Sequence, residues 1–99
     1  MANITWTGEA QQAIKNIAEY ISRDSVYYAE KQIQRFFEAV EVLYEHPQIG
    51  KPVREYNHKL IREILVGKYR IIYLLKTETQ IDILTVHHSA RLLHLDIEL

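Results

Sequence analysis

The chain has 99 residues, of which 47% are hydrophobic and 25% are charged, and its formal net charge at pH 7 is −1. This composition is typical of one soluble globular domain over residues 1–99 rather than of a disordered chain. No apolar run approaches the roughly 20 residues of a membrane helix, and no secretion signal is expected. Because cysteine is absent, disulfides and thiolate metal sites are excluded, and a cytoplasmic location is predicted.

Charge is distributed unevenly along the chain. Between Lys51 and Lys76, seven basic residues stand against two acidic ones, a net charge of +5. The stretch from Thr7 to His46 has a net charge of −3, and so do the residues after Lys76. The basic segment could face an anion, or it could belong to a solvated and balanced surface, and charge alone leaves both readings open.

The first half of the chain is predicted to form a strand and a helical hairpin. Residues 2–7 alternate apolar and polar side chains, as a short strand does. Thr7 can cap a first helix, whose apolar stripe over residues 10–21 repeats at spacings of three and four. After a short polar link, a second helix over residues 25–46 must end before Pro47. Its predicted buried side carries Ala29, Ile33, Phe36 or Phe37, Val40 and Leu43.

The second half has the period of strands. Three runs rich in isoleucine, leucine, valine and tyrosine cover residues 59–65, 69–75 and 81–87. Gly67 joins the first two runs in a tight turn, and a polar linker joins the second and third. The element order β-α-α-β-β-β predicts an α+β fold. It is a two-layer sandwich, with the helix hairpin packed on one face of a mainly antiparallel sheet.

Two arginines are the unusual feature of the strand hairpin. One face of the run 69–75 carries Arg70, Ile72 and Leu74, and Arg62 is likewise flanked by aliphatic residues in the preceding run. Since the helices can cover one face only, the other face is expected to be exposed unless the C-terminal tail folds over it. An apolar patch with arginines predicts a partner site, because arginine binds a carboxylate or phosphate through two hydrogen bonds. In the structural alternative the arginines pair with Glu63, Asp82 or a helix carboxylate.

The order and spacing of these elements resemble the RelE/ParE superfamily of toxins. The similarity rests on "HPQIGKP" after the second helix, "REILVGKYRIIY" in the strand hairpin and "ILTVHHSARLL" at the end, and it extends from Trp6 to about Leu95. Members are the toxin halves of bacterial type II toxin–antitoxin pairs, often plasmid stabilisation modules. The resemblance implies the two-layer fold, growth inhibition, and a cognate antitoxin whose C-terminal segment wraps around the toxin.

The superfamily contains two mechanisms, and one of them is enzymatic. RelE-like members cleave messenger RNA on the ribosome, which requires an acid or base and cations around the phosphate. By resemblance, Arg70 matches the arginine near the scissile phosphate, and Arg62 is a candidate second phosphate contact. His87 or His88, at the end of the last strand, matches the position of an acid or base in several of these nucleases. No cofactor or metal is implied.

ParE-like members instead bind DNA gyrase and need no such chemistry. Three features favour this branch: a charge near neutrality, where ribosome-binding nucleases are usually basic, no aromatic residue after His88, and adjacent histidines on opposite faces of one strand. The sequence therefore predicts a ParE-like toxin without enzymatic activity, with the ribosome-dependent endoribonuclease as the alternative and a homodimer left open. The predicted antitoxin or target contacts are Arg62, Arg70, Ile72, Leu74 and Arg91.

Overall fold

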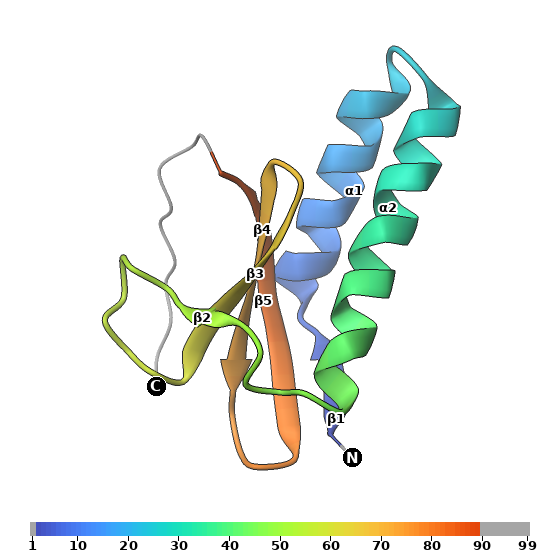
Figure 1. Ribbon diagram of the computed structural model, residues 1–99. Coiled ribbons are helices and arrows are strands. Elements are labelled where there is room, and N and C mark those ends of the chain that lie inside the picture. Colours follow the sequence, from blue (N-terminus) through green and yellow to red (C-terminus); the bar gives the residue numbers. More distant parts are fainter. Residues whose placement is uncertain (1, 90–99) are drawn as a thin grey trace.

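Two helices pack side by side on one face of a five-stranded sheet in the computed structural model, which describes residues 2–89 (Figure 1). The helices are α1 (Gly8–Ser22) and α2 (Val26–Glu41), and a short 3-10 helix, η1 (Val42–Tyr44), follows α2. The strands are β1 (Asn3–Trp6), β2 (Lys51–Pro52), β3 (Ile61–Val66), β4 (Tyr69–Leu75) and β5 (Gln80–His88). The predicted two-layer α+β fold is confirmed.

The sheet has the strand order β1-β5-β4-β3-β2. β1 runs parallel to β5, while the other neighbours are antiparallel, as predicted for a mainly antiparallel sheet. The two-residue edge strand β2 was not among the predicted elements. The register between β4 and β5 shifts between Ile72 and Tyr73, which pair with Thr85 and Ile83. Leu84 is thus the extra residue of a β-bulge.

Side-chain caps fix where both helices begin. The hydroxyl of Thr7 accepts a hydrogen bond of 3.2 Å from the amide of Ala10 and donates one of 2.8 Å to the carbonyl of Ile83. This second bond ties the start of α1 to β5. Ser25 caps α2 by accepting from the amide of Tyr28. Neither helix is long and apolar enough to cross a membrane, nor is any other helix within residues 2–89.

The larger core lies between the helices and the sheet. Phe36, Val40 and Leu43 face the sheet from α2 and η1, and each is buried. Phe36, and not Phe37, occupies the predicted core position. Phe37 is 47% exposed and lies against Trp6, with the two ring centroids 5.0 Å apart. The buried sheet residues of this core are Ile71, Tyr73, Ile81, Ile83 and Val86.

A smaller cluster lies on the opposite side of the sheet, which we call the helix-free face. Ile61 and Ile72 are fully buried there under Val53, and Tyr56 and Leu74 pack around them. The covering segment, residues 53–60, is the loop between β2 and β3 on the side of the sheet away from the helices (Figure 1). The expectation that this face exposes Ile72 is therefore wrong, because a loop covers it. The C-terminal tail, the predicted alternative cover, lies outside the described residues.

Candidate functional site

Arg70 is the centre of a polar cluster on the helix-free face. Arg70 is only 9% exposed, and each of its three guanidinium nitrogens has a carboxylate acceptor. Nη1 and Nη2 donate to Glu55 at 2.7 and 2.9 Å, and Nε donates to Glu63 at 2.5 Å. Glu63 belongs to β3, beside β4, whereas Glu55 comes from the covering loop. Arg70 thus joins the loop to the sheet and satisfies the predicted structural alternative of pairing with Glu63.

Arg70 and its two carboxylate partners influence one another electrostatically. The hydrogen bonds from Arg70 lower the pKa of Glu55, and those from Glu55 are the main cause that raises the pKa of Arg70. Two carboxylates surround one guanidinium, so the formal charges of these three side chains sum to −1. A phosphate approaching this cluster would meet two carboxylates, which already accept hydrogen bonds from three of the five N–H donors of Arg70.

Arg62 lies on the other face of the sheet. It pairs in register with Tyr73, whose side chain faces the helices, while Arg70 pairs with Leu65 on the helix-free face. Nη1 of Arg62 donates to the carbonyls of Gly50 at 2.8 Å and Gln48 at 3.3 Å. The expectation that the two arginines share one outward-facing surface is therefore wrong, and Arg62 anchors the segment before β2.

Tyr73 binds the same segment, residues 47–50, through its hydroxyl group. Its hydroxyl donates to the carbonyl of Pro47 and accepts from the amide of Gly50, both at 2.9 Å. Burial raises the pKa of the phenol. A Cβ at position 50 would lie 2.5 Å from the tyrosine hydroxyl and 2.7 Å from the carbonyl of Glu63. Glycine is required here because the backbone passes so close to both groups.

The two histidines lie on opposite faces, as predicted. His87 pairs in register with Arg70 on the helix-free face, whereas His88 pairs with Tyr69 and lies edge-on to its ring, with centroids 5.4 Å apart. Both are half-buried. Within residues 2–89, no group of three or more histidines, aspartates and glutamates could hold a metal ion.

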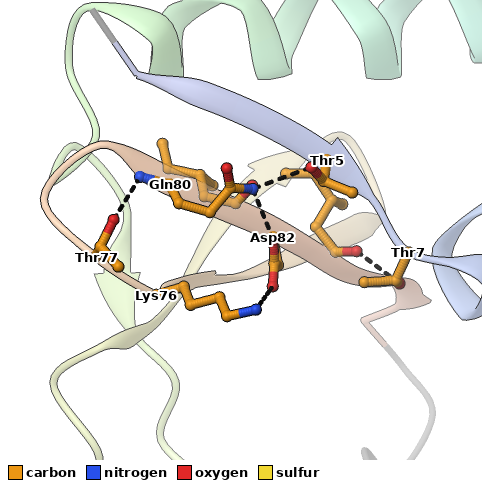
Figure 2. Close-up of polar contacts among 8 residues, drawn as sticks. Thr5, Thr7, Lys76, Thr77, Gln80 and Asp82 are labelled. Atoms are coloured by element: carbon orange, nitrogen blue, oxygen red, sulfur yellow. Dashed lines mark hydrogen bonds and ion pairs between the residues drawn. The ribbon is translucent and has the colours of Figure 1, made fainter.

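Polar side chains at the β1–β5 edge of the helix-free face bind one another (Figure 2). The side-chain amide nitrogen of Gln80 donates to the hydroxyl of Thr5 at 3.0 Å and to the carboxylate of Asp82 at 2.9 Å. Nζ of Lys76 lies 3.9 Å from the other carboxylate oxygen of Asp82, and the hydroxyl of Thr77 accepts from the backbone amide of Gln80. Asp82 therefore pairs with a lysine and a glutamine, and of the carboxylates named in the structural alternative it is Glu63 that pairs with an arginine.

The remaining residues predicted to contact the antitoxin or the target differ in how far they are buried. Ile72 is fully buried beneath the covering loop, Leu74 is half-buried at the edge of the same cluster, and Arg91 lies outside the described residues. The sequence interpretation did not single out Glu55, the second partner of Arg70. Its one available signal was that Glu55 and Glu63 are the two acidic residues of an otherwise basic segment.

Comparisons with known proteins identify the family of this chain. Residues 4–93 match the family described as ParE toxin of type II toxin–antitoxin system, parDE. The chain is 31% identical over 86 residues to Y4kP of Sinorhizobium fredii, a candidate toxin, an alignment that covers 87% of this chain and 86% of that protein.

Two solved structures share the fold. The chromosomal ParDE toxin–antitoxin system from P. aeruginosa aligns with a TM-score of 0.73 at 21% identity, covering 89% of this chain and 96% of that one. The toxin–antitoxin complex RelBE2 from Mycobacterium tuberculosis aligns with a TM-score of 0.58 at 20% identity, covering 88% and 96%. The match over residues 4–93 and the relative at 31% identity place this chain in the ParE family of type II toxin–antitoxin toxins.

Proposed function

We propose that this toxin inhibits growth in the cytoplasm by binding DNA gyrase, that it cleaves no RNA, and that a cognate antitoxin neutralises it. The observation that supports the non-nuclease mechanism is that Arg70 is already hydrogen-bonded to two carboxylates. The residue that a RelE-like reaction would use at the scissile phosphate is bound by Glu55 and Glu63. Membership of the ParE family supports the gyrase target.

The alternative mechanism would need a different arrangement of charge. Stabilising the developing charge on a phosphate requires donors that are free to point at it before the reaction begins. Here a phosphate would have to compete with both carboxylates for Arg70, and the pKa of Glu55 is lowered by that same arginine. Arg62, the predicted second phosphate contact, lies on the opposite face. Their placement on opposite faces supports a mechanism in which the two arginines do not clamp one phosphate.

The antitoxin partner is supported by the fold likeness to chains from the ParDE and RelBE2 systems. Of the contact residues predicted from the sequence, Leu74 is half-buried at the edge of the covered cluster, so we propose that it touches a partner directly. Ile72 and Arg70 are buried and act through the covering loop. Coexpression of the toxin with the adjacent reading frame should yield a stable complex that no longer inhibits growth.

The two mechanisms separate in one experiment with two readouts. The toxin is induced in cells, then plasmid supercoiling and ribosome-bound messenger RNA are followed in parallel, and purified gyrase is assayed with purified toxin. We expect loss of gyrase activity and intact messages. A variant with His87→Gln and His88→Gln should keep this effect, since no proton transfer is involved.

Glu55→Gln provides the sharpest comparison. It weakens the hold of the loop carboxylate on Arg70, so a nuclease that grips phosphate with Arg70 should cleave messages faster in this variant. We expect no cleavage by the wild type or by Glu55→Gln. Codon-dependent cleavage of ribosome-bound message that increases in Glu55→Gln and disappears in Arg70→Lys would overturn the proposal.

A further inference from the structure

A cleft lies between the second half of α1 and the adjoining ends of β4 and β5, on the helix side of the sheet. Its volume is about 610 Å³, which is within the range of small-molecule sites. α1 forms one wall of this cleft, and the first residue of β4 with the last residues of β5 forms the other. The cleft shares no residue with the cluster of Arg70, Glu55 and Glu63.

The wall formed by α1 carries a row of polar side chains. The row follows the helix at spacings of three and four residues, so its members lie on one face. It extends over roughly 10 Å of helix axis, at a rise of about 1.5 Å per residue. It supplies an amide, a carboxylate, an aromatic ring and a guanidinium to the same cleft. These side chains belong to Asn16, Glu19, Tyr20 and Arg23.

Both walls of the cleft carry aromatic rings. Tyr20 is 65% exposed on the α1 wall. On the strand wall, Tyr69 and His88 are half-buried and lie edge-on to each other, with ring centroids 5.4 Å apart. Exposed aromatic rings of this kind are surfaces on which planar bases stack. The cleft therefore favours a ligand with a planar aromatic body.

Arg23 and Glu19 bring opposite charges to this cleft. The guanidinium carbon of Arg23 lies 5.8 Å from the centroid of the Tyr20 ring, a cation–π contact that leaves the N–H donors at the guanidinium edge available. Among the described residues 2–89, neither Arg23 nor Glu19 forms an ion pair. Arg23 can thus donate two hydrogen bonds to a phosphate, and Glu19 can accept two from adjacent N–H groups of a ligand.

We infer that this cleft binds a guanine nucleotide. Guanine presents two adjacent N–H donors, at N1 and N2, and the carboxylate of Glu19 accepts both. The base stacks in the cleft beside Tyr20, and the phosphate binds Arg23. Adenine has an acceptor at N1, so it would place a lone pair against the carboxylate of Glu19. The inference does not rest on gyrase being the target of the toxin, and its test needs no gyrase.

Calorimetric titration of the purified chain with GMP tests the site, with AMP and guanosine as control ligands. We expect GMP to bind, with an affinity that falls as salt is raised. AMP should bind about tenfold more weakly or worse, because its base cannot donate twice to Glu19. Guanosine lacks the phosphate that Arg23 binds and should also lose about tenfold or more.

A short oligonucleotide that begins with a 5′-phosphorylated guanosine identifies the source of the nucleotide. If it binds more tightly than GMP, the ligand is the end of a single strand. If GMP binds more tightly, the ligand is a free nucleotide. Both results support the inference, because the base and the phosphate are the same in the two ligands.

The chain offers a matched control for the tyrosine–arginine pair. Tyr27 is 62% exposed, and Nζ of Lys31 lies 5.5 Å from the centroid of its ring, so a second tyrosine–cation pair lies outside the cleft. Tyr20→Ala and Arg23→Gln should each lower the affinity for GMP about tenfold without changing the melting temperature. Tyr27→Ala and Lys31→Gln should leave it within about twofold.

Glu19→Gln tests the recognition of the base, because an amide has one acceptor oxygen and no charge. It should bring the affinities for GMP and AMP within about twofold of each other. Equal affinity of the wild type for GMP and AMP, absence of GMP binding, or unchanged affinity in Tyr20→Ala and Arg23→Gln would overturn the inference. Nitrogen-15 NMR shifts on GMP addition should centre on α1 and Tyr69. Shifts that centre on Arg70 would overturn it by placing the nucleotide on the helix-free face.

Discussion

Arg70 on β4 and Glu55 in the loop between β2 and β3 are joined by two hydrogen bonds of 2.7 and 2.9 Å. This bidentate pair is what attaches residues 53–60 to the helix-free face, together with the burial of Val53. The attachment should depend on pH, since the hydrogen bonds from Arg70 lower the pKa of Glu55 in the folded state.

The first prediction is therefore a loss of stability in acid. A lowered folded-state pKa means that the pair contributes stability above the unfolded-state pKa of 4.5, and that this stability is lost as pH falls through the folded-state value. At pH 7, Glu55→Gln should lower the free energy of unfolding by about 1–2 kcal/mol, an amount reduced by the partial exposure of the carboxylate. Urea titrations at pH 7 and pH 3 should show this difference shrinking in acid. A constant difference at both pH values would contradict it.

The second prediction concerns the arginine itself. Arg70→Ala leaves Glu55 and Glu63 facing each other without a cation, which should cost about 3–5 kcal/mol of unfolding free energy. Arg70→Lys keeps the charge but cannot supply three donors in one plane, so it should recover only part of the loss. Chemical denaturation of the three proteins gives the order directly. An Arg70→Lys protein as stable as the wild type would show that the fork geometry is unimportant.

The third prediction tests the close approach of Gly50 to Tyr73. Gly50→Ala should destabilise the protein by about 1–3 kcal/mol, because its Cβ would overlap the tyrosine hydroxyl and the carbonyl of Glu63. Tyr73→Phe should cost a similar amount, about 1–3 kcal/mol, by leaving the Gly50 amide and the Pro47 carbonyl without partners.

The double variant decides whether these two costs have one origin. Removing the hydroxyl relieves part of the overlap, so Gly50→Ala and Tyr73→Phe together should cost less than the sum of the two. A double-mutant cycle measured by thermal or urea unfolding supplies the coupling. Additive costs would indicate that the backbone, and not the tyrosine, sets the requirement for glycine.

The fourth prediction concerns the helix–sheet core. Val40 is 3% exposed between α2 and the sheet, so Val40→Asp should abolish soluble folding by burying an unpaired charge. Val42→Asp, at a position that is 42% exposed, is the matched control and should fold normally. Circular dichroism and the yield of soluble protein distinguish the two. Normal melting of Val40→Asp would show that a different side of α2 packs against the sheet.

Local patterns were sufficient to predict the helices and the three long strands. The apolar stripe of α2 that includes Phe36 and Val40 repeats at helical spacing, and the alternation in β4 is visible in the sequence alone. The covering loop could not be found in this way, because residues 53–60 have no periodicity and Val53 is buried only through contacts with β3 and β4. The partner of Arg70 was missed for the same reason, since Glu55 belongs to that loop.

The placement of Arg62 was within reach of the sequence. Gly67 has a positive φ of 58° at the first position of a two-residue turn, which pairs Val66 with Tyr69. Counting back from that pair places Arg62 opposite Tyr73, and therefore on the helix side of the sheet. The alternation within each strand was read correctly, but the phase between the strands is set by the turn, and it decides which arginine faces which layer.

The pairing of β1 with β5 joins the two ends of the described chain. Ile4 lies beside Ile81 in this parallel pair, and the hydroxyl of Thr7 reaches the carbonyl of Ile83 across 76 positions of sequence. Contacts so distant in sequence slow folding, because a large loop must close before they form. During synthesis β1 has no strand to pair with until β5 has been made, so the sheet can be completed only after β5 has left the ribosome.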